Sequence, residues 1–114
     1  MEIWKTIKDY TNYQVSNYGN VRRVLSMGRT KVLVSCDNGN GYMRLNLYKN
    51  SCQTKFYVHR LVASAFMSNP RSLPEVHHKD HNKTNNNLYN LEWVTAKENI
   101  CYKINYYRNL KRAT

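Results

Sequence analysis

The first half of the chain alternates apolar and polar residues in short runs, which is typical of β-strands. One run covers residues 2–7, and two more within residues 13–24 flank the turn-forming sequence SNYGN. Further runs at 31–35 and 42–48 flank the sequence DNGNG, which favours a tight turn between strands. The pattern therefore predicts a small antiparallel β-sheet region built from hairpins.

The spacing of apolar residues changes after residue 57. Between residues 58 and 66 they recur every three or four positions, which predicts a helix over 58–67 that ends ahead of Pro70. We interpret the apolar stripe of this helix as core. His59 lies on the same helix, and we interpret it as a packing or capping residue.

The last part of the chain is predicted to form a strand, a loop, a strand and a helix. Short strands near residues 73–80 and 91–95 enclose the polar loop HNKTNNNLYN. Thr95 and Glu98 have the spacing of a capping box, so a helix should begin there. Apolar residues on one face and basic residues near the end are consistent with that helix: Ile100, Ile104, Tyr107, Lys111 and Arg112. The predicted fold class is α+β.

The net charge of the chain indicates that it binds a polyanion. Eighteen Lys and Arg stand against seven Asp and Glu, which gives a formal net charge of +11. The excess is uneven, because residues 22–71 hold nine basic side chains and a single acid, Asp37. A field of this kind favours nucleic acid, although a merely soluble basic protein would also carry it.

Cysteine usage and the N-terminus bear on the cellular compartment. Cys36, Cys52 and Cys101 are odd in number and form no C-x-x-C pair, which argues against a disulfide framework and against a thiolate zinc site. The N-terminal residues show no secretory signal, and no apolar run approaches the length of a membrane span. We predict a cytoplasmic protein without membrane contact.

Candidate chemistry is concentrated in the sequence EVHHKDHN, which holds three of the four histidines. His77 and His78 would point to opposite sides of a regular strand, but a strand end could bring both near the following helix. Asn99 lies one turn into that helix, where its amide oxygen could share a metal ion with an imidazole. Because histidine titrates near neutrality, the second imidazole could accept a proton.

The sequence VHHKDHNKTNNNLYNLEWVT, followed by AKEN, resembles the HNH endonuclease family in its ββα-metal, or His-Me finger, form. It is most similar to homing-type HNH nucleases of phages and introns, which often carry segments like EIWKTIKDYTNYQVSNYGNVRRV and YVHRLVASAF ahead of the site. The resemblance implies a β-rich DNA-binding segment over 1–57 and the nuclease motif over 58–114, packed as one compact unit.

The resemblance also implies a role for each position of the motif. His78 matches the general base that deprotonates the attacking water, and His77 and Asn99 match the ligands of one divalent ion. Asn90 matches the middle asparagine, which ties the loop together and helps to orient the base. The family usually accepts magnesium, and the imidazole at His77 would widen the choice to manganese, nickel or zinc.

DNA is the expected partner, and the protein is expected to act as a monomer or weak dimer. From charge position alone, six basic residues are the candidates for DNA contact: Arg22, Arg23, Arg44, Arg60, Lys79 and Lys83.

Two other functions are consistent with parts of the sequence. The first is a DNA-binding module without catalysis, in which the HNH site is degenerate. The second is a structural zinc site built from His77, His78 and His81, which is disfavoured because a closed cage needs a fourth ligand. Many HNH relatives have glycine where this chain has His81, which we interpret as a solvent-facing turn residue rather than a phosphate contact or a further ligand.

Overall fold

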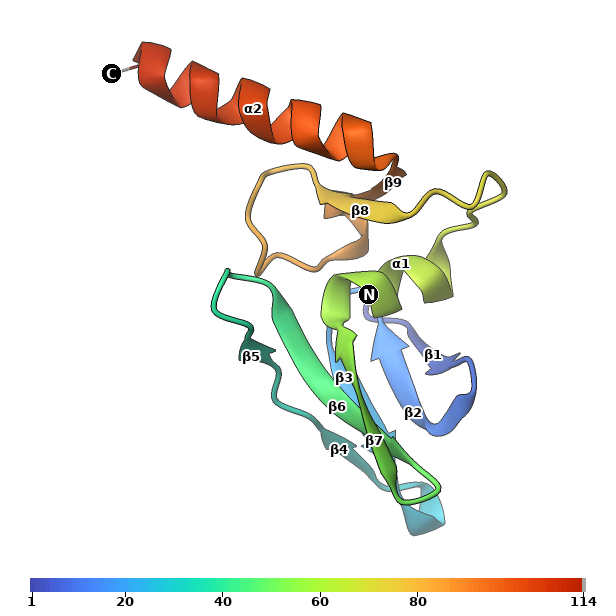
Figure 1. The fold of residues 1–114 in the computed structure, drawn as a ribbon. Coiled ribbons are helices and arrows are strands. Elements are labelled where there is room, and N and C mark those ends of the chain that lie inside the picture. The colour runs from blue at the N-terminus through green and yellow to red at the C-terminus, as the bar shows by residue number, and fades with distance from the viewer. Residues whose placement is uncertain (114) are drawn as a thin grey trace.

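The computed structural model describes the backbone of residues 1–113 and the side chains of residues 1–105. Three antiparallel sheets and two α-helices make up this part of the chain (Figure 1). The prediction of an α+β fold with an antiparallel β-rich first half is confirmed.

The first sheet has the order β1-β2-β3-β4. Its strands are β1 (Trp4–Ile7), β2 (Tyr10–Ser16), β3 (Val21–Val24) and β4 (Thr30–Val32), with the short 3₁₀ helix η1 (Ser26–Gly28) before the last. The register Val15↔Val21 confirms the hairpin predicted around SNYGN.

The second sheet has the order β5-β6-β7, formed by β5 (Cys36–Asp37), β6 (Met43–Lys49) and β7 (Cys52–Tyr57). Here the prediction was wrong in one respect. The run at 31–35 does not pair with the strand after DNGNG, because β4 pairs with β3 and β6 takes β7 as its long partner. The sequence pattern gave no sign of β7, since none of its residues is buried and no alternation results.

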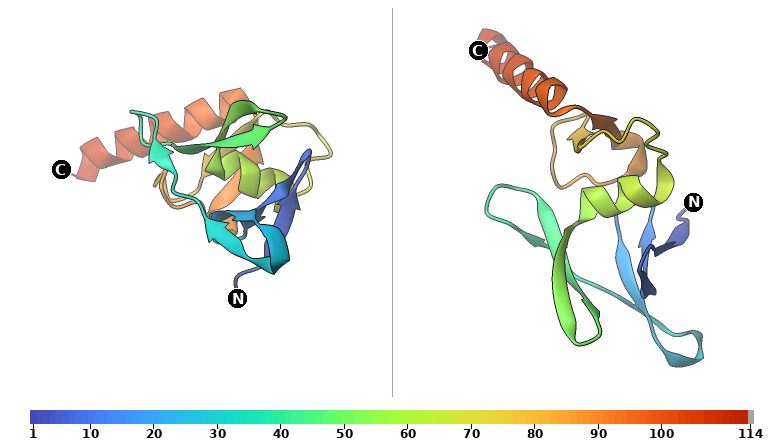
Figure 2. Two further views of the ribbon diagram at one scale, coloured as in Figure 1. Left: turned by 90° about the horizontal axis from the view of Figure 1, so that it is seen from below. Right: turned by 45° about the vertical axis from the view of Figure 1, so that its right-hand side comes forward.

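Helix α1 (Val58–Phe66) lies at the centre of the molecule, between these two sheets and the C-terminal elements (Figures 1 and 2). It contacts strands of all three sheets. Val58, Leu61, Val62 and Ala63 are buried in one hydrophobic core that also contains residues of both N-terminal sheets. The predicted helix and its core stripe are therefore confirmed.

The C-terminal elements are β8 (Glu75–His78), the 3₁₀ helix η2 (Leu88–Asn90), β9 (Leu91–Val94) and α2 (Ala96–Ala113). β8 and β9 pair as an antiparallel ribbon, and α2 leaves it at one end of the molecule (Figure 2). The capping box is formed, because the Glu98 backbone N–H donates to Thr95 Oγ1 and the Thr95 N–H donates to Glu98 Oε1.

Two features of α2 complete the comparison with the sequence. Ile100 and Ile104 share a face as expected, but they are 57% and 50% exposed, so this face does not join the core. The expectations for Tyr107, Lys111 and Arg112 lie outside the residues whose side chains are described. Among the described residues, no helix combines the length and apolar character that crossing a membrane requires.

Candidate active site

Strand β8 carries the two adjacent histidines into the interior. His77 pairs in register with Glu92 and His78 with Leu91, and both imidazoles are buried. His78 is the last residue of the strand. Both residues line one small pocket of about 30 Å³.

Asn90 holds the loop that follows the histidines. Its Nδ2 donates to Asp80 Oδ1 and to the carbonyl of Asn85, both at 2.9 Å, and its Oδ1 accepts from the Asp80 backbone N–H. The structure therefore brings Asn90 to the loop-tying position that the sequence suggested. These bonds run to the loop and none of them reaches His78.

The hydrogen-bond partner of His78 is a different asparagine. His78 Nε2 lies 2.9 Å from the side-chain oxygen of buried Asn86. An amide oxygen only accepts, so Nε2 carries the ring proton and Nδ1 is left with a free lone pair. Burial lowers the pKa of His78 below its ordinary value, which keeps this lone pair available at neutral pH.

His77 faces the first turns of α2. Its ring stacks on Tyr102 with centroids 4.6 Å apart, and the side chain of Asn99 lies close enough to act on the pKa of the ring. Burial, followed by the nearby His81, lowers the pKa of His77. A neutral imidazole and an amide side chain thus lie close together, and both line the small pocket that His78 also lines.

These donors fit a divalent ion that draws most of its ligands from elsewhere. Among the described residues, no group of three or more His, Cys, Asp or Glu side chains could hold a metal ion, which argues against the closed zinc site. His77 and Asn99 supply one nitrogen and one oxygen, a pair that suits manganese, nickel or zinc as well as magnesium.

His81 differs from the exposed turn residue that the sequence suggested. It has a positive φ of 61°, a conformation that explains why glycine would suit this position. Its side chain is half-buried, and its ring centroid lies 5.0 Å from that of His77. His81 lies near His77 because the chain turns tightly after β8, where the His81 N–H donates to the His78 carbonyl.

The basic residues near the pocket are partly engaged within the protein. Lys83 donates from Nζ to the carbonyl of Asn40, at 2.8 Å, and lies over the Tyr42 ring. Arg60 pairs with Glu75 at 3.1 Å, while Lys79 is exposed. Lys83 therefore joins the loop between β8 and η2 to the β5–β6 turn.

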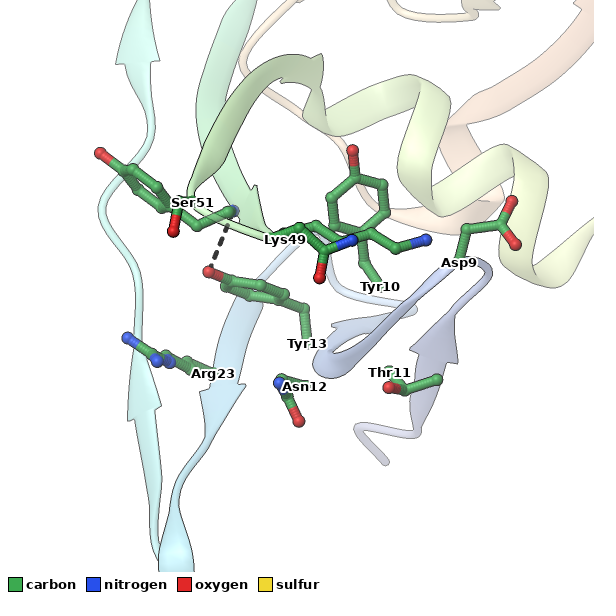
Figure 3. Close-up of a pocket in the computed structure, with 10 residues that line it drawn as sticks. Asp9, Tyr10, Thr11, Asn12, Tyr13, Arg23, Lys49 and Ser51 are labelled. Atoms are coloured by element: carbon green, nitrogen blue, oxygen red, sulfur yellow. Dashed lines mark hydrogen bonds between the residues drawn. The ribbon is translucent and has the colours of Figure 1, made fainter.

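The other candidate DNA contacts lie on the N-terminal sheets. Arg22 donates to Gln14 and packs on Trp4, and Arg44 is half-buried on β6. Arg23 is exposed and lines a second hollow of about 410 Å³ between β2 and the β6–β7 turn, together with Lys49 (Figure 3). This hollow shares no lining residue with the histidine pocket.

Three residues of the site were not identified from the sequence. Asn86 is one of three consecutive asparagines, and nothing in the sequence separates it from its neighbours. Tyr42 was not singled out in the predicted strand 42–48, and its ring centroid lies 6.1 Å from that of His78. His59 was interpreted as a packing residue, and it is buried with its ring centroid 4.9 Å from that of His78.

Comparison with known families agrees with this geometry. Residues 2–48 match the NUMOD4 motif, and residues 56–100 match the HNH endonuclease family. The chain belongs to the HNH endonuclease family. The matched range contains His77, His78, Asn90 and Asn99, so the site described above lies within the HNH part of the chain.

Several HNH relatives are similar over most of this chain. It is 44% identical over 98 residues to the DNA endonuclease I-HmuI of Bacillus phage SP01, which covers 85% of this chain and 55% of that protein. It is 41% identical over 101 residues to an uncharacterized HNH endonuclease, L245, of Acanthamoeba polyphaga mimivirus, covering 89% of this chain and 29% of that protein.

A solved structure, described as DNA binding and cleavage by the HNH homing endonuclease I-HmuI, has the same fold. It superposes with a TM-score of 0.73 at 41% identity, over 98% of this chain and 60% of that one. The chain therefore spans less than two thirds of the length of each of these relatives.

Proposed function

We propose that this protein is a metal-dependent endonuclease that hydrolyses phosphodiester bonds of DNA. The observation that carries the proposal is the state of His78, whose Nε2 is bound to Asn86 so that Nδ1 keeps its lone pair, in a pocket that His77 and Asn99 also line. The relatives named as DNA endonucleases, and the solved complex described as DNA binding and cleavage, support the same activity.

His78 acts as the general base in this proposal. Its Nδ1 accepts a proton from the attacking water, and the proton that Nε2 shares with Asn86 keeps the ring in the required tautomer. The lowered pKa of His78, caused first by burial, keeps the ring unprotonated before the step. Asn90 acts indirectly, by holding the loop that contains Asn86.

His77 and Asn99 would hold the divalent ion. The ion, when bound, would stabilise the charge on the phosphate and on the leaving oxygen. The stacking of His77 on Tyr102 fixes the plane of the imidazole, so one ligand is oriented before an ion arrives. Magnesium is the expected ion, with manganese, nickel or zinc as alternatives.

DNA would be held by the basic residues named from the sequence, of which Arg23 and Lys79 are the most exposed. If several phosphates are neutralised, affinity should fall on the order of a thousandfold across a fourfold rise in salt. Affinity that does not change with salt in a gel-shift titration would exclude these residues as phosphate contacts.

Cleavage of supercoiled plasmid tests the proposed activity. With magnesium or manganese the wild-type protein should convert plasmid to open circles or linear DNA, and EDTA should stop the reaction. Mapping the cut ends on each strand then separates nicking from double-strand cleavage.

The second candidate function, a DNA-binding module with a degenerate site, makes the opposite prediction. His78→Ala should abolish cleavage while gel-shift affinity stays nearly unchanged, because the ring is buried and belongs to the proton-transfer step. If wild type and variant both bind DNA and neither cuts with any divalent ion, the binding module is the right description.

A further inference from the structure

His59 is a buried polar residue whose presence the core does not explain. It is the second residue of α1 and is only 6% exposed. Its Nδ1 is buried and has no hydrogen-bond partner among the residues that the structure describes. Leaving a buried polar atom unsatisfied costs about 1–3 kcal/mol, so an apolar ring would stabilise this position better than an imidazole.

The contacts of His59 point to the base rather than to the core. Its ring centroid lies 4.9 Å from that of His78, closer than the 5.4 Å to Tyr42 and the 5.7 Å to Tyr57. Asn86 fixes one edge of the His78 ring through a single hydrogen bond. A single bond leaves the ring free to tilt about it, so the rings packed beside His78 determine its plane.

The imidazole of His59 is uncharged at neutral pH. Burial, followed by the neighbouring His78 and Arg60, lowers its pKa to about 3. A neutral imidazole carries a fixed dipole, which a phenyl ring of similar shape lacks, and in a dry site such a dipole acts strongly on its neighbours.

We infer that His59 is a positioning residue for the proposed base, and that both the contact and the dipole of its imidazole fix the orientation of the His78 ring. This inference rests on the proposed function, because it assigns His59 a role only through His78. His59 thereby links α1, the helix at the centre of the molecule, to the end of β8.

Two substitutions in the full-length chain test the inference. His59→Phe keeps a ring but removes the dipole, and the hollow of about 340 Å³ that His59 lines leaves room for the larger side chain. His59→Ala removes both. In plasmid cleavage at saturating magnesium, kcat should fall on the order of tenfold for His59→Phe and about a hundredfold for His59→Ala, with KM unchanged in both.

Two further measurements separate positioning from a loss of folding. His59→Phe should unfold in urea at the same or a higher concentration than wild type, since it removes the unsatisfied nitrogen. ¹⁵N NMR should show the His78 proton on Nε2 in both proteins, because Asn86 is unchanged, but broader His78 ring signals in His59→Phe, where the plane of the ring is no longer fixed. Tyr57→Phe is the matched control, because this neighbouring ring has no ring contact with His78, and its kcat should equal that of wild type.

A His59→Phe variant with wild-type kcat, or with raised KM and unchanged kcat, would overturn the inference. So would a Tyr57→Phe variant that loses kcat equally, because any disturbance of the ring cluster would then suffice. If wild type cuts and His78→Ala does not, these results concern His59 alone. If wild type does not cut, or His78→Ala cuts as wild type does, the proposed function is wrong and this inference with it.

Discussion

At the scale of single residues, Asn86 is the side chain on which the proposed base depends. Replacement by alanine removes the acceptor of the His78 Nε2 proton, so the ring would lose its fixed tautomer. We expect kcat for plasmid cleavage to fall on the order of tenfold to a hundredfold, with DNA affinity unchanged in gel shifts. Asn87→Ala is the control, because Asn87 makes no side-chain cap to η2. Equal activity of the two variants would remove Asn86 from the mechanism.

The burial of His59 predicts how stability depends on pH. The pKa of His59 is lowered from 6.5 to about 3 by burial, so between these values the unfolded chain binds a proton that the folded chain does not. Neutral His59 therefore does not lower the free energy of unfolding above pH 6.5. As pH falls from 6.5 toward 3, the free energy of unfolding decreases by about 1.4 kcal/mol per pH unit. Urea unfolding at pH 7.5, 6.5, 5.5 and 4.5 should show wild type losing more stability than His59→Phe. Parallel curves would contradict the prediction.

The sequence could predict some of these residues and not others. His77, His78 and Asn99 stand out because residue type and spacing within a strand–loop–strand–helix unit are sufficient to bring them together. Asn86 does not stand out, because its role depends on the loop conformation that Asn90 imposes through bonds to Asp80 and Asn85. Identical side chains in a row can be told apart only by where the backbone directs them.

At the scale of elements, the turn of the β2–β3 hairpin supports the loop that contains Asn86. Gly19 in this turn has a φ of 89°, and a Cβ there would lie 2.9 Å from Asn86 Cβ. Gly19→Ala should therefore lower stability by about 1–2 kcal/mol through backbone strain and also displace Asn86, which lowers kcat. Urea unfolding and plasmid cleavage measure the two effects.

Gly39→Ala separates strain from displacement. Gly39 has a φ of 99° in the β5–β6 turn, and a Cβ there would meet nothing within 4 Å. The strain should be similar, so stability should fall by a similar amount while kcat stays at the wild-type value. If both variants keep the wild-type kcat, the contact between the β2–β3 turn and Asn86 does not influence His78.

The elements themselves were largely readable from the sequence, but their pairing was not. Apolar period and turn residues predict α1 and the first hairpin, because these signals are local. The pairing of β6 with β7 depends on the exposed strand Cys52–Tyr57, which has no buried face to produce a pattern. Tyr42 was missed for a related reason, since its ring lies beside histidines from elements distant in the sequence.

At the scale of the molecule, the division at residue 57 stays a prediction, and several contacts weigh against two independent halves. The core of α1 includes residues of both N-terminal sheets. The Leu88 N–H donates to the Asn17 carbonyl, and Lys83 donates to that of Asn40. Two turns of the N-terminal region, β2–β3 and β5–β6, therefore contact the segment between β8 and β9, which favours a single cooperative unit.

The two tryptophans can report on each half separately. Trp4 lies on β1 and Trp93 on β9, so Trp4→Phe and Trp93→Phe each leave one fluorophore in one half. If the chain unfolds as one unit, the fluorescence transition of each variant in urea should coincide with its own transition by far-UV circular dichroism. A Trp4 signal that changes at a clearly different urea concentration from the helical signal would show that residues 1–57 fold independently. In that case the contacts at Asn17 and Asn40 would only dock one domain on the other.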